Sequence, residues 1–174
     1  MIHLVRRFVE WVLPARLSGA DEAWALDRLS PPERNLWLRQ HRRDRAHSIA
    51  VARAVVAEVG EDDPRIVVAA LCHDVGKGVA GLGVIGRVAA TLAERVVDDQ
   101  RAARWSWRSD PLGRIGMYLR YPALGAELLA EGGSDQMVVA WAREHHLEPE
   151  EWTIPRHIGE VLRRADDGAT AWSS

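Results

Sequence analysis

The chain has 174 residues, of which 47% are hydrophobic and 28% charged, and a formal net charge of -2. This length suffices for one compact domain with a hydrophobic core, and the composition is that of a globular protein rather than a disordered or membrane-embedded one. Because the net charge is not positive, we expect no stable binding of nucleic acid. The single cysteine, Cys72, excludes an internal disulfide and fits a reducing, cytoplasmic environment.

Residues 1–30 are predicted to hold an amphipathic helix and a connection. Apolar residues recur at helical spacing through residues 4–13, and Pro14 ends or bends this helix. Two arginines and a glutamate interrupt the apolar run, which argues against a signal peptide or a membrane span. We expect the helix to pack on its own domain, the alternative being a helix for a membrane surface or a partner.

Ser30 marks the start of the next helical segment. It precedes Pro31 and stands three residues before Glu33, a pattern typical of a capping box with proline at the first helical position. We therefore expect helical structure from about Pro31 towards Val59, where Gly60 ends it.

The remaining chain also carries helical signals. Pro64 begins a helix that is apolar on every side from Ile66 to Cys72, which indicates a fully buried helix. Further helices are expected over residues 84–97, 112–119, 123–130, 135–146 and 155–166. No alternating strand pattern occurs in the sequence. The prediction is an all-α protein, an irregular helical bundle over residues 31–167 with a flexible tail at 168–174.

His47 stands ahead of an apolar stripe on the first long helix. The stripe is formed by Ala50, Val51, Ala54 and Val55. Because these residues follow His47 at three, four, seven and eight positions, His47 is expected to point inward. An inward histidine is either a metal ligand or a hydrogen-bonded core residue, and His47 alone does not decide between them.

His73 and Asp74 follow directly on the buried helix. Adjacent helical residues diverge by about 100°, so both side chains can face one ion only if the helix finishes there, which Gly76 permits. Imidazole and carboxylate together suit a divalent transition metal such as Mn, Fe, Co, Ni or Zn. The alternative is a helix end with a favourable histidine and an exposed aspartate.

The last predicted helix offers a second carboxylate. Its apolar stripe consists of Ile158, Val161, Leu162 and Ala165. Asp166 extends this stripe, whereas Asp167 falls on the polar face. A buried carboxylate needs a cation or hydrogen-bond donors, so an inward Asp166 fits a metal site, and an exposed position at a fraying helix end is the alternative.

Two further places carry candidate site residues. His145 shares the apolar face of its helix, and His146 is its neighbour, so that one is a candidate ligand and the other a candidate substrate contact, unless both are capping or surface residues. Lys77 is the only lysine of the chain and can reach a substrate phosphate, unless it is a solvated loop residue. The arginines and aromatic residues of segment 101–120 either clamp phosphates and a base or form an amphipathic connection.

The order of His47, then His73 and Asp74, then a distant Asp166 resembles the HD-domain superfamily of metal-dependent phosphohydrolases over residues 36–166. The strings HDVGK from His73, YPALGAELL from Tyr121 and HHLE from His145 are similar to segments of this superfamily, the last two to its cyclic-dinucleotide-hydrolysing HD-GYP subgroup. The resemblance implies the HD-type helical fold for residues 31–167.

The resemblance also implies a ligand set. His47, His73, Asp74 and Asp166 would hold one metal, and His145 would belong to a second metal that Asp74 bridges. Tyr121 stands where the dinuclear subgroup has a histidine, and a neutral phenol binds such ions poorly. We therefore expect one metal per chain. The glycine-tyrosine-proline triplet is missing after HHLE, so cyclic-dinucleotide specificity is not carried over.

The expected function is hydrolysis of a phosphate monoester or phosphodiester, with a phosphorylated small molecule such as a nucleotide as substrate. Asp74 and Lys77 are the expected catalytic residues, and Lys77 and His146 the expected substrate contacts. One alternative is a catalytically decayed domain that acts as a regulatory or ligand-binding module. Another is an oxidative enzyme, which would need two irons. The sequence leaves the oligomeric state open.

Overall fold

The computed structural model describes residues 17–93 and 96–172. Its elements are α2 (Gly19–Arg28), α3 (Pro31–Leu38), α4 (Arg42–Val59), α5 (Pro64–Cys72), the 3-10 helix η1 (Val75–Gly78), α6 (Val84–Ala93), α7 (Asp99–Ser106), α8 (Pro111–Leu119), α9 (Tyr121–Glu131), α10 (Gln136–Glu144) and α11 (Arg156–Trp172). No strand occurs within the described ranges, which confirms the all-α prediction. None of the described helices is long and apolar enough to cross a membrane.

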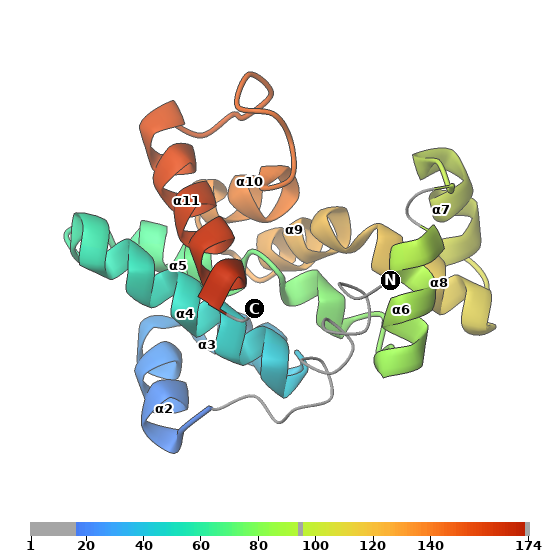
Figure 1. The fold of residues 1–174 in the computed structure, drawn as a ribbon, viewed down its shortest axis with the longest axis horizontal. Coiled ribbons are helices and arrows are strands. Elements are labelled where there is room, and N and C mark those ends of the chain that lie inside the picture. The colour runs from blue at the N-terminus through green and yellow to red at the C-terminus, as the bar shows by residue number, and fades with distance from the viewer. Residues whose placement is uncertain (1–16, 94–95, 173–174) are drawn as a thin grey trace.

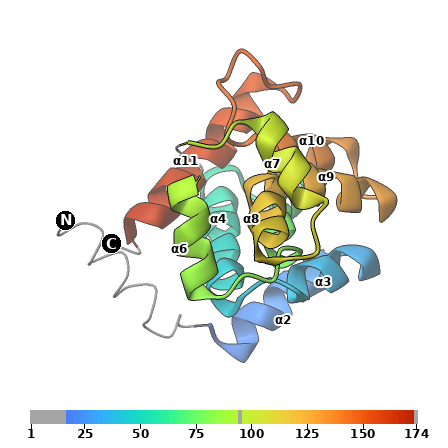
Figure 2. The same ribbon diagram turned by 90° about the vertical axis from the view of Figure 1, so that its right-hand side faces the viewer.

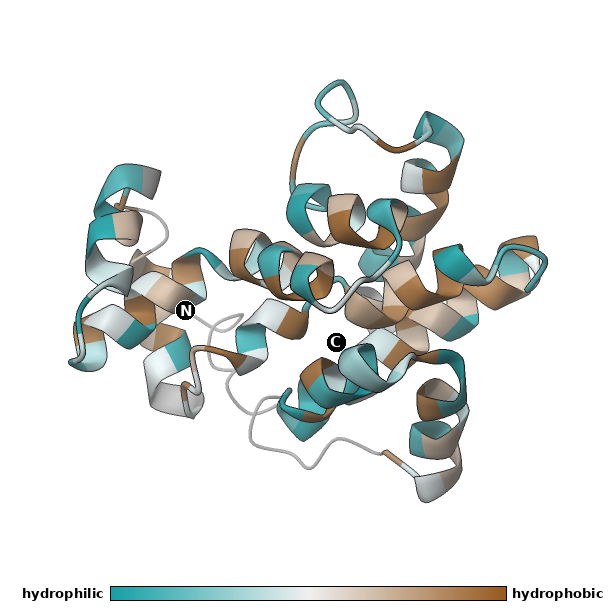
Figure 3. Ribbon diagram, turned by 180° about the vertical axis from the view of Figure 1, so that it is seen from behind, coloured by the Kyte–Doolittle hydropathy of each residue, from teal (hydrophilic) through white to brown (hydrophobic). Residues whose placement is uncertain are grey.

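Helix α5 lies at the centre of the bundle. It packs against α4 on one side and α10 on the other, α11 crosses α4, and α2 and α3 cover the lower side in Figure 1. Helices α6, α7 and α8 form a separate lobe, which α9 joins to the bundle (Figures 1 and 2). In Figure 3, hydrophobic segments gather where the helices cross, whereas hydrophilic segments mark the outer turns and loops. The short helix η1 packs on α9 and contacts α3.

The predicted buried helix is confirmed for Val67 and residues 69–72, whereas Ile66 and Val68 are only partly buried. Asp63 caps α5 by accepting a hydrogen bond from the backbone N–H of Arg65, and Pro64 occupies the first turn. Residues 69–72 are fully buried, and they belong to the single large core cluster. Because α5 ends at Cys72 with His73 as its C-cap, the ligand candidates leave the helix at the centre of the core.

The long helix expected from Pro31 to Val59 is divided into two, α3 and α4. The break at residues 39–41 contains neither glycine nor proline, so the local sequence does not predict it. His41 caps α4 through its Nδ1, which accepts from the N–H of Arg43, and Gly78 of η1 packs closely against the backbone of Arg39 and Gln40. Contact with η1, a distant segment, accompanies the break.

The apolar stripe predicted after His47 is only half buried. Val51 and Val55 belong to the core, whereas Ala50 and Ala54 are exposed. The prediction was wrong for the two alanines. Their side chains are too short to fill the space between α4 and the crossing helix α11, which therefore retains a hollow lined by both.

The structure differs from the prediction at the C-terminal end of the chain, and it does not describe the first predicted helix at the N-terminal end. The helix expected over residues 4–13 lies outside the described residues. The flexible tail expected at 168–174 is wrong as far as Trp172, because α11 continues to that residue and Ala169 joins the core cluster. The apolar face of α11 extends one turn past Ala165, and burial of that face favours the longer helix. Helices α2 and α7 were not among the expected elements.

Candidate metal centre

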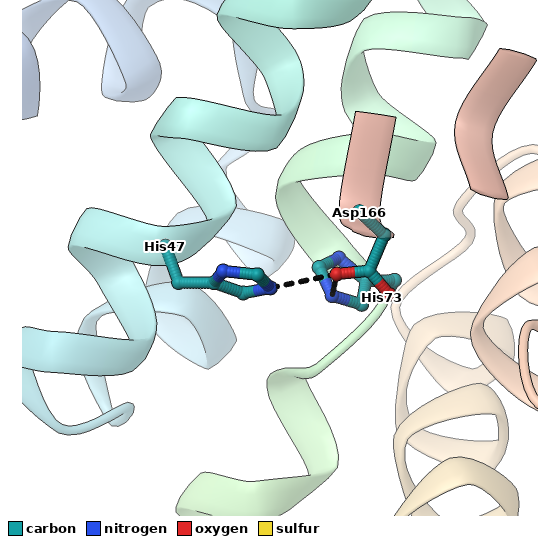
Figure 4. A group of neighbouring side chains, drawn as sticks. All are labelled: His47, His73 and Asp166. Atoms are coloured by element: carbon teal, nitrogen blue, oxygen red, sulfur yellow. Dashed lines mark hydrogen bonds and ion pairs between the residues drawn. The ribbon is translucent and has the colours of Figure 1, made fainter. Parts of the chain in front are cut away.

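Three helices bring His47, His73 and Asp166 together. His47 comes from α4, His73 from the end of α5, and Asp166 from α11 (Figure 4). His47 Nε2 lies 2.8 Å from Asp166 Oδ1, and His73 Nε2 lies 3.9 Å from the same oxygen. The three potential ligand atoms all lie within 4.8 Å of one another. The sequence-based choice of Asp166 over Asp167 is thereby confirmed in position.

The spacing of these atoms is of the order that a divalent ion requires. Bonds of about 2.0–2.2 Å to nitrogen and oxygen place neighbouring ligand atoms roughly 3–3.5 Å apart. The two distances from Asp166 Oδ1, 2.8 and 3.9 Å, lie on either side of this range. His73 Nδ1–H donates to the carbonyl of Ala70 at 2.8 Å, which turns Nε2 towards the site. His73 is only 2% exposed, and its Nε2 has no hydrogen-bond partner among the described residues. A cation would satisfy this buried nitrogen.

Asp74, the fourth predicted ligand, is not part of the group formed by the other three, and it adjoins this group through His73. Its Oδ2 lies 3.4 Å from His73 Nε2 and accepts a hydrogen bond from Lys77 Nζ at 2.5 Å. Its Oδ1 is buried and has no hydrogen-bond partner in the described part of the chain. Burial by itself raises the pKa of Asp74, but the charges of Lys77 and His73 hold it well below its usual range. Asp74 is therefore an ionised carboxylate at the edge of the cluster.

His73 and Asp166 are also charged when the candidate site holds no metal ion. Burial lowers the pKa of His73, but the carboxylates of Asp74 and Asp166 outweigh it and raise this pKa to about 8. Burial raises the pKa of Asp166, but the hydrogen bond with His47 and the charge of His73 lower it to about 2. At neutral pH the proton on His73 thus partly neutralises a cluster that is otherwise anionic.

This proton predicts a pH-dependent metal affinity. A metal ligand must be deprotonated, and the raised pKa means that His73 is mostly neutral above pH 8 and mostly protonated below it. The apparent affinity for a divalent ion should therefore fall as the pH decreases below 8, by up to about tenfold per pH unit. Calorimetric titrations in two buffers of different ionisation enthalpy measure the proton released. An affinity that stays constant between pH 8 and pH 6 would contradict this assignment.

His145, Tyr121 and His146 form a second cluster beside Asp74. His145 Nδ1–H donates to the carbonyl of Ala142 at 3.1 Å, and its Nε2 lies 3.7 Å from Asp74 Oδ1. The hydroxyl of Tyr121 lies 3.3 Å from the same Nε2 and forms a short hydrogen bond with His146 Nε2. Tyr121 therefore stands between the two histidines. His145 is buried as expected, and its neighbour His146 is exposed.

The environment keeps His145 neutral. Burial lowers its pKa to about 3, and the neighbouring charges of His73 and His146 act in the same direction. Burial also lowers the pKa of His146 and raises that of Tyr121. The cluster is therefore an uncharged hydrogen-bonded group beside the charged one.

Lys77 lies on top of Asp74 and Tyr121. Its Nζ is 4.7 Å from the centre of the Tyr121 ring, and burial, which lowers its pKa, is outweighed by the charge of Asp74, so the pKa lies well above the usual range. The carboxylate of Asp44, which forms a buried ion pair with Arg87 at 2.6 Å, makes a smaller contribution in the same direction. Sequence reasoning missed this pair, because residues 43 positions apart with no shared pattern give no local signal.

Glu144 supports the histidine cluster and was also missed. It is buried, and its two carboxylate oxygens accept from the N–H and the hydroxyl of Thr153, each at 2.7 Å. These bonds close the loop that follows His145 and His146. A signal was present, since Glu144 follows Met137 and Trp141 at seven and three positions on the face that also predicted His145.

Gly76 does more than permit the helix to end, because it also allows two backbones to approach closely. A Cβ atom at this position would lie 1.9 Å from the carbonyl oxygen of Tyr121 and 2.9 Å from the N of Gly125. The backbones of η1 and α9 therefore touch, with the glycines of HDVGK and YPALG facing each other. This contact fixes Lys77 and Tyr121 relative to the cluster.

The segment 101–120 lies in the lobe, on α7 and α8. Two of its arginines bind within the segment, Arg108 to Asp110 and Arg120 to Ser106, and Arg114 binds the carbonyls of residues 80 and 81. Trp107 is 88% exposed. These interactions favour a structural connection over a phosphate clamp.

Comparison with known proteins identified no relative of this chain. No protein-family model, no curated protein and no solved structure matches the chain. The similarity of its motifs to the HD-domain superfamily stays a resemblance carried by the quoted residues. The convergence of three helices at His47, His73 and Asp166 is independent of that resemblance.

Proposed function

We propose that this protein is a metal-dependent phosphohydrolase that uses one divalent transition metal, of the group Mn, Fe, Co, Ni and Zn. The supporting observation is the convergence of His47, His73 and Asp166, together with two buried polar atoms, His73 Nε2 and Asp74 Oδ1, that have no hydrogen-bond partner among the described residues. Two imidazoles with carboxylates are a ligand set for this group of metals rather than for calcium. The substrate class is a phosphate monoester or phosphodiester, a nucleotide among them.

In this proposal His47, His73, Asp74 and Asp166 hold the ion. A bound ion of this kind lowers the pKa of a water ligand and polarises a phosphoryl oxygen. Asp74, with one oxygen bonded to Lys77 and the other without a hydrogen bond, would orient the attacking water. The burial of Asp74 keeps competing solvent away from this step.

Lys77 and His146 form the substrate side of the site. The ammonium of Lys77 stays charged at neutral pH and lies between Asp74 and the Tyr121 ring, so it can bind a phosphoryl oxygen and stabilise the charge that develops there. His146 is exposed and neutral, its Nε2 is hydrogen-bonded to the Tyr121 hydroxyl, and it contacts the substrate from the exposed side of the site.

Tyr121 supports the proposal of one metal per chain. Its hydroxyl lies between His145 and His146, the two imidazoles nearest to Asp74 outside the ligand set. Burial raises the pKa of this phenol, so it stays neutral and is a poor ligand. A single ion favours hydrolysis over oxygenation by paired irons.

The experiment that tests this function compares the protein with Lys77→Gln. Metal analysis should find one ion per chain in both. A screen of nucleotides, phosphomonoesters and phosphodiesters should find metal-dependent turnover, and Lys77→Gln should lower kcat/KM by about a hundredfold, since the loss of one charge-stabilising group costs this much. Arg156→Gln, an exposed arginine paired with Glu160, is the control and should leave turnover unchanged.

Two results would overturn the proposal. Full turnover after removal of the metal rejects the mechanism. Bound metal without turnover on any of these substrates assigns the site to a regulatory or ligand-binding module instead.

A further inference from the structure

Helices α4 and α11 cross in Figure 1. A hollow of about 330 Å³ lies between them. Its floor consists of small side chains, Ala50 and Ala54 from α4 and Ala165, Gly168 and Ala169 from α11. A Cβ atom on Gly168 would meet nothing within 4 Å, so the space above this residue is open. The hollow has room for roughly two or three apolar side chains. We call it the α4–α11 groove.

The groove has no charge to offer a polar ligand. The two charged residues at its rim, Glu58 and Arg164, neutralise each other in an ion pair of 2.6 Å. Ala50 and Ala54 are exposed in the groove although their spacing continues the apolar face of α4. An apolar occupant would bury both alanines and complete that face.

The chain itself contains a segment with an apolar face that suits the groove. Residues 4–13 carry Leu4, Val5, Phe8, Val9 and Val12 at helical spacing, with Arg6 and Arg7 on the other face. We propose that residues 4–13 dock in the α4–α11 groove as an amphipathic helix. This inference does not depend on the phosphohydrolase activity.

The point where the described chain begins favours this occupant. Leu17 is buried beside the first turn of α4, and its carbonyl accepts from Arg42 at 2.7 Å. Helix α2 then continues along α4, with Trp24 stacked 4.0 Å from the guanidinium of Arg53. The segment before Leu17 is therefore tethered at the amino end of the helix that forms half of the groove.

The distances fit this tether. Ala50 and Ala54 lie 8 and 12 residues after Arg42, which is about 12 and 18 Å along α4. The chain from Leu13 to Leu17 spans at most about 14 Å, and a helix over residues 4–13 adds about 15 Å. Phe8, near the middle of that helix, can therefore reach either alanine.

The groove adjoins the candidate metal centre along both helices. His47 stands one turn before Ala50 on α4, and Asp166 follows Ala165 on α11. Both ligand candidates are partly exposed, with 22% and 27% of their side chains accessible in the described part of the chain. A segment in the groove would lie beside this accessible edge.

Disulfide trapping tests the docking in the full chain. Phe8→Cys is combined with Ala50→Cys in one variant and with Ala54→Cys in another, which brackets one helical turn of register. At least one pair should form an intramolecular disulfide under mild oxidation. The matched controls replace Arg7 instead of Phe8 and should stay reduced. The native Cys72 is fully buried and does not compete.

A charge placed in the groove gives a second measurement. Ala54→Glu should speed tryptic cleavage after Arg6 and Arg7 by about tenfold, because cleavage follows the undocked population. Ala57→Glu adds the same charge at an exposed site of α4 outside the groove and should leave the cleavage rate unchanged. Equal rates in the two variants and the parent, or no disulfide in either pair, overturn the inference. Disulfide-linked dimers would overturn it too and assign the groove to a second copy of the chain.

Discussion

Asp166→Asn is expected to lower the affinity for the divalent ion by on the order of a thousandfold. Changes in groups that only orient a ligand cost about 10–100-fold, and the loss of a charged ligand costs more. Asp166 Oδ1 lies 2.8 Å from His47 Nε2, so the amide keeps the shape of the site but removes the negative charge that the two imidazoles share. Competition with a chelator of known affinity measures the effect.

Asp167→Asn is the matched control for this experiment. Asp167 is the next residue on α11, carries the same charge and is exposed. Its substitution should leave the affinity for the ion within about twofold of the parent. In the metal-free protein, only Asp166→Asn should lower the pKa of His73, because the charge of Asp166 contributes to raising it. Equal metal affinities in the two variants would rule out Asp166 as a ligand.

Gly76→Ala is expected to destabilise the fold by about 3 kcal/mol, the upper range for overpacked sites. The added Cβ would lie 1.9 Å from the carbonyl oxygen of Tyr121, and the next nearest atoms are also backbone, so no flexible side chain can give way. η1 and α9 must separate, which moves Lys77 away from the Tyr121 ring. Urea denaturation measures the loss of stability.

Gly19→Ala provides the comparison. Gly19 begins α2, and a Cβ atom there would meet nothing within 4 Å. Its substitution should change the free energy of unfolding by less than about 0.5 kcal/mol. If Gly76→Ala were as stable as Gly19→Ala, the close contact of η1 with α9 would not exist in solution.

Periodicity predicted correctly where a helix buries one continuous face. It placed His145 on the buried face of α10, and it separated Asp166 from Asp167 on α11. The end of α5 before His73 agrees with the expectation that the helix finishes at His73 and Asp74. These predictions worked because one rotation of 100° per residue decides which side chains point inward.

Features that depend on two distant segments escaped prediction. The break between α3 and α4 coincides with the approach of Gly78, and the ion pair of Asp44 with Arg87 joins α4 to α6. The exposure of Ala50 and Ala54 depends on how closely α11 crosses α4. None of these distances is encoded in the local pattern of either segment.

The sequence by itself determined the all-α class, the buried helix ahead of His73 and the inward faces that carry His145 and Asp166. These are local properties, since the hydrophobic spacing of a single helix specifies them. Only the tertiary structure decided that His47, His73 and Asp166 meet within 4.8 Å. It also decided that the Tyr121 hydroxyl stands between two histidines. The first follows from the crossing of α4, α5 and α11, which are far apart in the chain, and the second from the packing of the neighbouring helices α9 and α10. The packing of the whole core determines both.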